Sequence, residues 1–147
     1  REVILNVDNG YNLRLFGCFG FYEQNDRFIK ASIEKIIASE PIVIHQNRYM
    51  DFIYAKDVCK VIEHYILSEK EDLPKDLNLC YDEKKSLVDI VHILKSLTET
   101  SIDVKLESDE IGLEYTGDAS VLSALNIDFL GLEQGIKQVY GGLIDAK

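Results

Sequence analysis

Apolar positions recur along the chain at two spacings, one typical of helices and one typical of strands. Apolar residues that return every three to four positions predict helices over about residues 27–39, 56–68, 86–98 and 132–144, with a short helix over 118–125. Short apolar or alternating runs predict strands at residues 11–16, 41–45, 51–54, 77–80 and 102–106. Residues 1–8 resemble the last turns of a further helix. Strands that alternate with helices indicate an α/β fold.

Local signals set the expected helix ends. Asp26, Ser86 and Asp118 are expected to cap three helices, and Asn9-Gly10 and Pro41 to end two. The helix over 56–68 is expected to point its apolar residues inward, namely Val58, Val61, Ile62, Tyr65 and Ile66.

The stretch YMDFIYAKDVCKVIEHYIL, residues 49–67, passes from an aromatic strand directly into a helix. α/β proteins place ligands where a strand ends and a helix begins. Phe52 and Tyr54 alternate with Ile53, so one set faces the core and the other is free for a ligand; the core is the better interpretation for both aromatic rings. Asp57 is expected to cap its own helix and to complement that helix's dipole.

The composition describes one globular domain. The chain has 147 residues, of which 46% are hydrophobic and 29% charged. Its longest apolar runs are too short to span a bilayer, and no signal peptide is visible, because residues 1–3 begin within a helical pattern. Cys18, Cys59 and Cys80 lack C-x-x-C spacing, which favours reduced, partly buried thiols in a cytoplasmic protein. No histidine stands at a spacing that favours a catalytic cysteine.

The net charge of −10 argues against nucleic-acid binding. Residues 1–60 are neutral overall, and residues 61–147 supply the whole negative charge. All four arginines, which suit bidentate phosphate contacts, lie in the first third of the chain. An anionic ligand would therefore meet the N-terminal half, although chance would produce the same clustering.

No motif in the chain makes a complete active site. There is no glycine-rich phosphate loop, no H-E-x-x-H and no Cys/His metal cluster, and Gly17-x-x-Gly20 is not followed at once by a helix. The three histidines are scattered, and each fits a strand end or a helix surface. We therefore expect no catalytic residue and no metal ligand.

Several stretches, taken in order, resemble the extended short-chain dehydrogenases/reductases, the NAD-dependent nucleotide-sugar epimerase, dehydratase and reductase family. Residues 12–20, NLRLFGCFG, are similar to its R-x-F-N-V-Y-G-P strand and loop, and Arg27-Phe28-Ile29 matches its R-F-I. DFIYAKDV at 51–58 is similar to D-F-I-Y-V-D-D-V, the most specific of these motifs. The matches EPIVI at 40–44, LNL at 77–79 with Ser86-Leu87, and the closing stretch 118–135 follow in the family's order.

The resemblance implies the C-terminal half of a Rossmann-type enzyme: the last strands of its sheet together with a small α/β substrate lobe. Over residues 1–147 the chain would be the substrate-binding portion, without the N-terminal dinucleotide-binding half. That half would bind NAD or NADP and carry the Y-x-x-x-K pair just upstream of Arg1. The intact parent is expected to be a cytoplasmic homodimer acting on a nucleotide-diphosphate sugar, and this chain alone to be inactive. Tyr81-x-x-x-Lys85 has the catalytic spacing but lies between a strand and a helix cap, so we do not assign it.

The substrate-binding residues implied by the resemblance are Arg48, Arg27, Lys35, Gly17 and Asn47. Met50 stands where many members have an arginine that grips the diphosphate. Arg48 lies two residues earlier, on the same face of a strand, and is the candidate to replace it. Gly17 replaces an asparagine that commonly touches substrate, Asn47 also fits a simple turn, and Arg14 is expected to make structural pairs.

Two questions stay open at the level of sequence. The alternative function is a non-catalytic module that binds a sugar nucleotide or a protein. In addition, strands 11–16 and 77–80 would be exposed edges in an isolated half. We expect them to pair with each other, to pair with another chain, or to belong to a longer protein.

Overall fold

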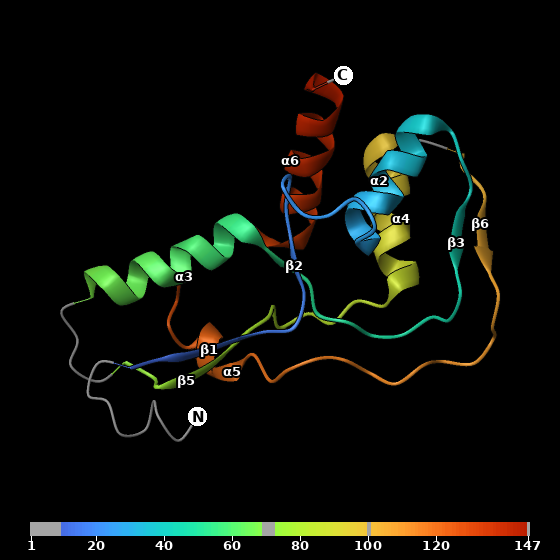
Figure 1. Ribbon diagram of the computed structural model, residues 1–147. Coiled ribbons are helices and arrows are strands. Elements are labelled where there is room, and N and C mark those ends of the chain that lie inside the picture. Colours follow the sequence, from blue (N-terminus) through green and yellow to red (C-terminus); the bar gives the residue numbers. More distant parts are fainter. Residues whose placement is uncertain (1–9, 69–72, 100, 147) are drawn as a thin grey trace.

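The computed structural model describes residues 10–68, 73–99 and 101–146. The helix expected at residues 1–8 and its Asn9 stop lie outside the described residues. Strands and helices are interspersed along the chain, as the sequence predicts, and β2 is a strand that the sequence did not predict (Figure 1). They are β1 (Asn12–Leu15), β2 (Cys18–Phe19), α2 (Phe28–Ala38), β3 (Ile42–Ile44), β4 (Ile53–Tyr54), α3 (Ala55–Leu67), β5 (Asp76–Leu79), α4 (Leu87–Thr98), β6 (Val104–Leu106), α5 (Ser120–Ser123) and α6 (Gly131–Asp145).

Strands β1 and β5 pair with each other in parallel, which confirms the first of the three expected outcomes. The register places Asn12 opposite Asp76 and Leu15 opposite Leu79. The prediction that Arg14 makes structural pairs is confirmed, because its guanidinium donates to Asn78 Oδ1 at 2.7 Å and to Asp76 Oδ1 at 2.8 Å. Helix α3 covers one face of this pair and α5 packs against it, as Figure 1 shows on the left.

The larger core lies where α2, α4 and α6 gather around the short parallel pair β2–β4 (Figure 1). The residues that the three helices bury completely are Ile29, Ile33, Ile90, Val91, Leu94 and Ile136. In α2 and α4 they recur at three- and four-residue spacing, so the helical pattern in the sequence identifies this core directly.

A further strand pair, β3–β6, forms the far edge of the molecule (Figure 1). Beyond β3 the chain runs through residues 47–51, which lie between two other segments. Tyr49 bridges Ser86 on one side, and Met50 bridges Tyr115 on the other. Backbone hydrogen bonds hold the acidic stretch 107–117 beside residues 44–51.

The expected cap of α2 and part of the expected inward face of α3 were wrong. Asp26 does not cap α2: Arg27 occupies the N-cap, and no side chain caps it. Ile62 and Ile66 do not point inward but are 43% and 74% exposed. Asp118 does accept the Ser120 N–H at 2.9 Å, although the cap position of α5 is Ala119.

Ser86 caps α4 as predicted, in a capping box with Asp89. The Ser86 hydroxyl accepts the Asp89 N–H, and the Asp89 carboxylate accepts both the Ser86 hydroxyl and the Ser86 N–H. The two bonds to the carboxylate, that of the hydroxyl first, hold the pKa of Asp89 below its ordinary value. Replacing Ser86 by alanine should lower the free energy of unfolding by about 1 kcal/mol. Urea denaturation of Ser86→Ala and of Ser96→Ala, a control on the same helix, checks this; equal stability of the two variants would contradict it.

Candidate functional site

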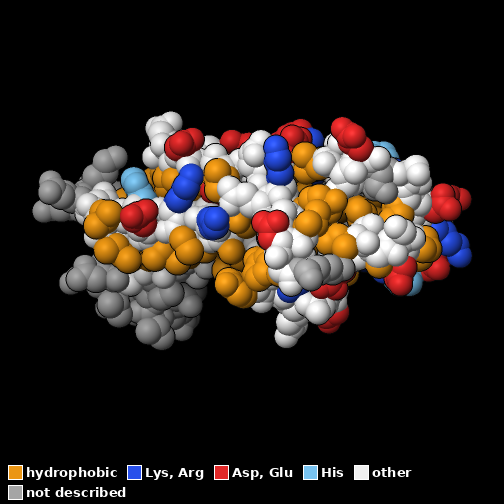
Figure 2. Space-filling model, turned by 90° about the horizontal axis from the view of Figure 1, so that it is seen from above, with side chains coloured by type: hydrophobic (Ala, Val, Ile, Leu, Met, Phe, Trp, Pro, Cys, Tyr) orange, Lys and Arg blue, Asp and Glu red, His pale blue; other side chains and the backbone are white. Residues whose placement is uncertain are grey.

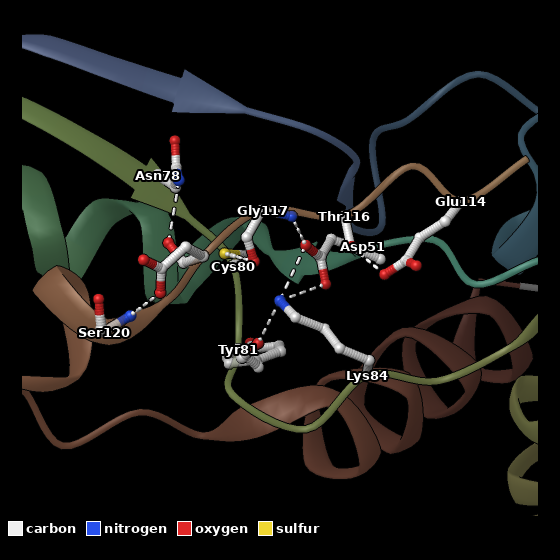
Figure 3. Close-up of polar contacts among 10 residues, drawn as sticks. Asp51, Asn78, Cys80, Tyr81, Lys84, Glu114, Thr116, Gly117 and Ser120 are labelled. Atoms are coloured by element: carbon white, nitrogen blue, oxygen red, sulfur yellow. Dashed lines mark hydrogen bonds and ion pairs between the residues drawn. The ribbon is translucent and has the colours of Figure 1, made fainter.

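The strand-to-helix joint at residues 51–57 carries two buried carboxylates, and the first of them is Asp51. Figure 3 shows Asp51 between Lys84, on the loop before α4, and Gly117, on the segment before α5. Lys84 Nζ donates to the two Asp51 oxygens at 2.9 and 3.0 Å and to the Tyr81 carbonyl at 2.8 Å. The Gly117 N–H donates to Asp51 Oδ2 at 2.7 Å. Asp51 therefore fastens three chain segments together.

The second carboxylate, Asp57, is completely buried at the start of α3. The sequence predicted that Asp57 caps α3, and this was wrong. Its carboxylate instead accepts the backbone N–H groups of Leu130 and Gly131, both at 2.9 Å, where α6 begins. The Tyr81 hydroxyl donates to the same carboxylate at 2.6 Å and accepts the Tyr54 N–H at 3.1 Å. Asp57 thus joins α3, β4, α6 and the loop after β5.

Tyr81 and Lys85 do not form a catalytic pair. Lys85 forms an ion pair with Glu83, and both Tyr81 and Lys85 precede α4 in a loop. Burial, followed by the hydrogen bond to Asp57, raises the pKa of Tyr81 far above that of a free tyrosine. A phenol held in this way does not ionise near neutral pH and is a structural group.

The raised pKa of Tyr81 predicts a loss of stability in alkali. Because the folded pKa lies above the unfolded value of about 10, its contribution is complete below pH ~10 and falls as the pH rises beyond it. Tyr81→Phe removes this dependence, so the stability difference between wild type and variant should shrink above pH ~10. Guanidinium denaturation from pH 8 to 11 measures it, with the exposed Tyr22→Phe as control. Parallel curves for wild type and Tyr81→Phe would contradict it.

A pocket of about 340 Å³ lies beside this joint, between the start of α2, strand β3 and the segment 46–52. We call it the arginine pocket. Its apolar wall consists of Phe28, Val43, Ile44, Met50, Phe52 and Leu87, and its polar side chains are Asp26, Arg27, His45, Gln46 and Arg48. The rings of Phe28 and Phe52 stack with their centroids 6.3 Å apart. The pocket therefore has an aromatic wall and a rim with two arginines and one aspartate.

Arg27 and Arg48 both line this pocket although they come from separate parts of the fold. In the part of the chain that the structure describes, neither guanidinium donates a hydrogen bond or forms an ion pair. Met50 lines the same pocket as Arg48. Two unpaired guanidinium groups in one pocket can receive an anion.

The other three predicted binding residues do not line the arginine pocket. Lys35 is in the last turn of α2, about 12 Å along the helix axis from Arg27. Gly17 lies against the joint, where a Cβ would come within 2.5 Å of the Asp51 carbonyl oxygen. Asn47 Oδ1 accepts the Val88 N–H at 3.2 Å and so helps to fix the start of α4.

Sequence reasoning missed the interactions of Asp51 and Lys84, and it missed Gly112, which lies against the pocket side chains Gln46 and Arg48. An aspartate within an aromatic strand was a signal for the first, because a buried carboxylate needs a partner. No local signal marked Gly112, since its neighbours come from a segment more than 60 residues earlier.

The cysteines and histidines of the described residues give no sign of an activated thiol or a metal site. Burial, the main cause, raises the pKa of the Cys18 and Cys80 thiols, the opposite of what activates a nucleophile. Cys80 is buried and Cys18 half-buried as expected, but Cys59 is exposed. Among the residues that the structure describes, no group of three His, Cys, Asp or Glu side chains can hold a metal.

The fold is that of an α/β protein with short parallel strand pairs, and comparison with known proteins gives the family. The model of the NAD dependent epimerase/dehydratase family matches residues 6–80, half of the chain. The chain belongs to this family. No curated protein matches it.

Solved structures of nucleotide-sugar epimerases share the fold. UDP-glucuronic acid 4-epimerase from Bacillus cereus, in complex with UDP-glucuronic acid and NAD, is 19% identical with a TM-score of 0.74, covering 93% of this chain and 46% of that one. UDP-N-acetylglucosamine 4-epimerase from Methanobrevibacter ruminantium, in complex with UDP-N-acetylmuramic acid, is 24% identical with a TM-score of 0.70, covering 92% and 46%. UDP-glucose 4-epimerase from Thermus thermophilus, in complex with NAD, is 14% identical with a TM-score of 0.75, covering 92% and 46%.

The chain spans about half the length of these solved structures. Within residues 10–68, 73–99 and 101–146, no helix is both long enough and apolar enough to cross a bilayer.

Proposed function

We propose that the chain is the substrate-binding part of an NAD(P)-dependent nucleotide-sugar epimerase, dehydratase or reductase, and that the arginine pocket receives the nucleotide diphosphate. The observation that carries this proposal is the pair of unpaired guanidinium groups, Arg27 and Arg48, on one pocket. Arginine binds phosphate oxygens through charge-assisted, often bidentate hydrogen bonds. Membership of the family and its fold supports a nucleotide sugar as the anion.

The pocket's chemistry suits one part of such a ligand. Its volume of about 340 Å³ is at the lower end of ligand pockets, which run from ~300 to ~1,000 Å³. Its apolar wall favours a flat ring, and Gln46 and His45 offer hydrogen-bonding groups at the rim. We therefore propose that the nucleoside diphosphate binds in this pocket and that the sugar binds to the parent protein outside it.

We assign the chain to the C-terminal half of its parent. Among the described residues, β1 and β5 form a parallel sheet of two strands, whereas parallel sheets normally belong to α/β folds that cover both of their faces. Helix α3 also exposes Ile62, Ile66 and Leu67, and Figure 2 shows hydrophobic atoms along the end of the molecule where α3 lies. A dinucleotide-binding half would extend the sheet and cover these side chains.

In this proposal the parent's N-terminal half holds NAD or NADP and the Y-x-x-x-K pair, so hydride transfer and proton transfer take place there. This chain then contributes recognition and is inactive alone, and it contributes no catalytic residue. The intact parent is a cytoplasmic homodimer.

A second candidate is a non-catalytic module that binds a sugar nucleotide. Two departures favour it: Met50 replaces the family's usual arginine, and Gly17 replaces its usual asparagine. The reading frame upstream of Arg1 separates the two candidates. A Y-x-x-x-K within about ten residues upstream supports the enzyme, and its absence supports the module.

The proposal is tested by calorimetric titration of the chain with UDP and, separately, with NAD. UDP should bind saturably at one site, and NAD should not. Saturable NAD binding tighter than that of UDP would overturn the proposal that the N-terminal half binds the cofactor and this chain binds the substrate. Absence of UDP binding would overturn the assignment of the arginine pocket.

A further inference from the structure

The segment 107–112 runs beside two side chains of the arginine pocket, Gln46 and Arg48, and meets them at Gly112. The Glu107 N–H donates to the Ile44 carbonyl at 3.0 Å, and the Gly112 N–H donates to the Asn47 carbonyl at 2.7 Å. These two bonds fix the segment beside the chain that carries Gln46 and Arg48.

At Gly112 there is no room for a side chain. A Cβ at this position would lie 2.8 Å from Gln46 Oε1, 3.1 Å from Gln46 Cδ and 3.4 Å from Arg48 Nε. Contacts under 3.0 Å force a neighbour to move. The neighbours here are the ends of two flexible side chains and not backbone, so these side chains would move and the fold would not.

The backbone does not itself demand glycine here. Among the described residues, Gly131 is the one glycine with a positive φ. Gly112 therefore does not have a positive φ, and alanine can adopt its conformation without strain. The residues on either side are exposed, Ile111 at 68% and Leu113 at 89%, so core packing does not fix the residue at 112 either. The space at 112 serves the two pocket side chains.

We propose that Gly112 is a positioning residue of the arginine pocket, whose missing side chain allows Gln46 and Arg48 to hold the orientation in which they bind the ligand's diphosphate. The inference rests on the proposed function of that pocket. Any side chain at 112 displaces Gln46 first, because Gln46 Oε1 is the nearest atom. Gln46 then displaces or crowds the guanidinium of Arg48.

The test is a double-mutant cycle of UDP affinity, measured by calorimetry. Gly112→Ala should bind UDP about fivefold more weakly, the effect of moving side chains off their preferred rotamers. In a Gln46→Ala background the nearest contact is gone, so Gly112→Ala should change the affinity less than about twofold. Gly141→Ala, at a helical glycine with nothing within 4 Å, should bind as wild type does. A general disturbance of the segment would persist in the Gln46→Ala background and would overturn the proposal, as would unchanged affinity in Gly112→Ala.

A second readout keeps the inference separate from the proposed function. In the absence of ligand, Gly112→Ala should shift the NMR resonances of the Arg48 Nε–H and the Gln46 side-chain amide, and Gly141→Ala should leave both in place. If wild type fails to bind UDP but these shifts occur, the proposed ligand is wrong and the positioning stands. If the shifts are absent, the positioning is wrong whatever the pocket binds.

Discussion

Replacing Arg48 by alanine should weaken UDP binding roughly 30- to 150-fold, which corresponds to the loss of about 2–3 kcal/mol from charge-assisted hydrogen bonds. The guanidinium lines the arginine pocket, and no described side chain pairs with it. Its removal therefore costs binding without leaving a buried partner unsatisfied. The free energy of unfolding should change by less than about 0.5 kcal/mol.

The matched variants separate charge from geometry. Arg48→Lys keeps the positive charge but loses the planar fork, so it should recover only part of the affinity. Arg14→Ala removes an arginine that pairs with Asp76 and Asn78, away from the pocket, and should leave UDP affinity unchanged. Equal loss of affinity in Arg14→Ala and Arg48→Ala would mean that UDP responds only to the net charge, which contradicts a site at this pocket.

Replacing Asp57 by alanine should be the most destabilising of the substitutions considered, with a loss of about 3–5 kcal/mol in the free energy of unfolding. The Asp57 carboxylate is completely buried and accepts three hydrogen bonds, from Tyr81, Leu130 and Gly131. Its removal leaves two backbone N–H groups and a hydroxyl unsatisfied in the interior, and it removes a negative charge from the N-terminus of α6.

Thermal and chemical denaturation of Asp57→Ala and Asp57→Asn measure this loss. Asparagine keeps an acceptor oxygen in place and should lose less than alanine. Glu63→Ala, an exposed acidic residue on the same helix, should stay within about 0.5 kcal/mol of wild type. If Asp57→Ala is as stable as Glu63→Ala, the carboxylate is not what joins α6 to the joint.

The helices and most strands follow from the sequence because their apolar residues keep a regular spacing. The capping box at Ser86 is local, and it is present where its residues predict it. The pairing of β1 with β5 was one of three options that the sequence left open, since pairing depends on residues more than 60 positions apart.

The sequence could not show where the polar side chains of the joint would go. Asp57 has the position of a cap for its own helix, yet it binds the start of α6, 73 positions later. The inward faces predicted for Ile62 and Ile66 failed for a related reason: helical spacing gives the side of a helix, not whether another element covers it. Of the predicted binding residues, Arg27 and Arg48 line one pocket. Lys35 lies at the far end of α2, and Gly17 and Asn47 make contacts with Asp51 and Val88 that depend on residues distant in the sequence.

The most direct test of nucleotide binding at the arginine pocket is a map of UDP contacts on the ¹⁵N-labelled chain by NMR titration. We expect saturable shifts confined to the residues around the arginine pocket, at 26–28, 43–50 and 87, and their loss in Arg48→Ala. Shifts centred instead on the β1–β5 pair, or shifts that persist unchanged in Arg48→Ala, would contradict binding at this pocket.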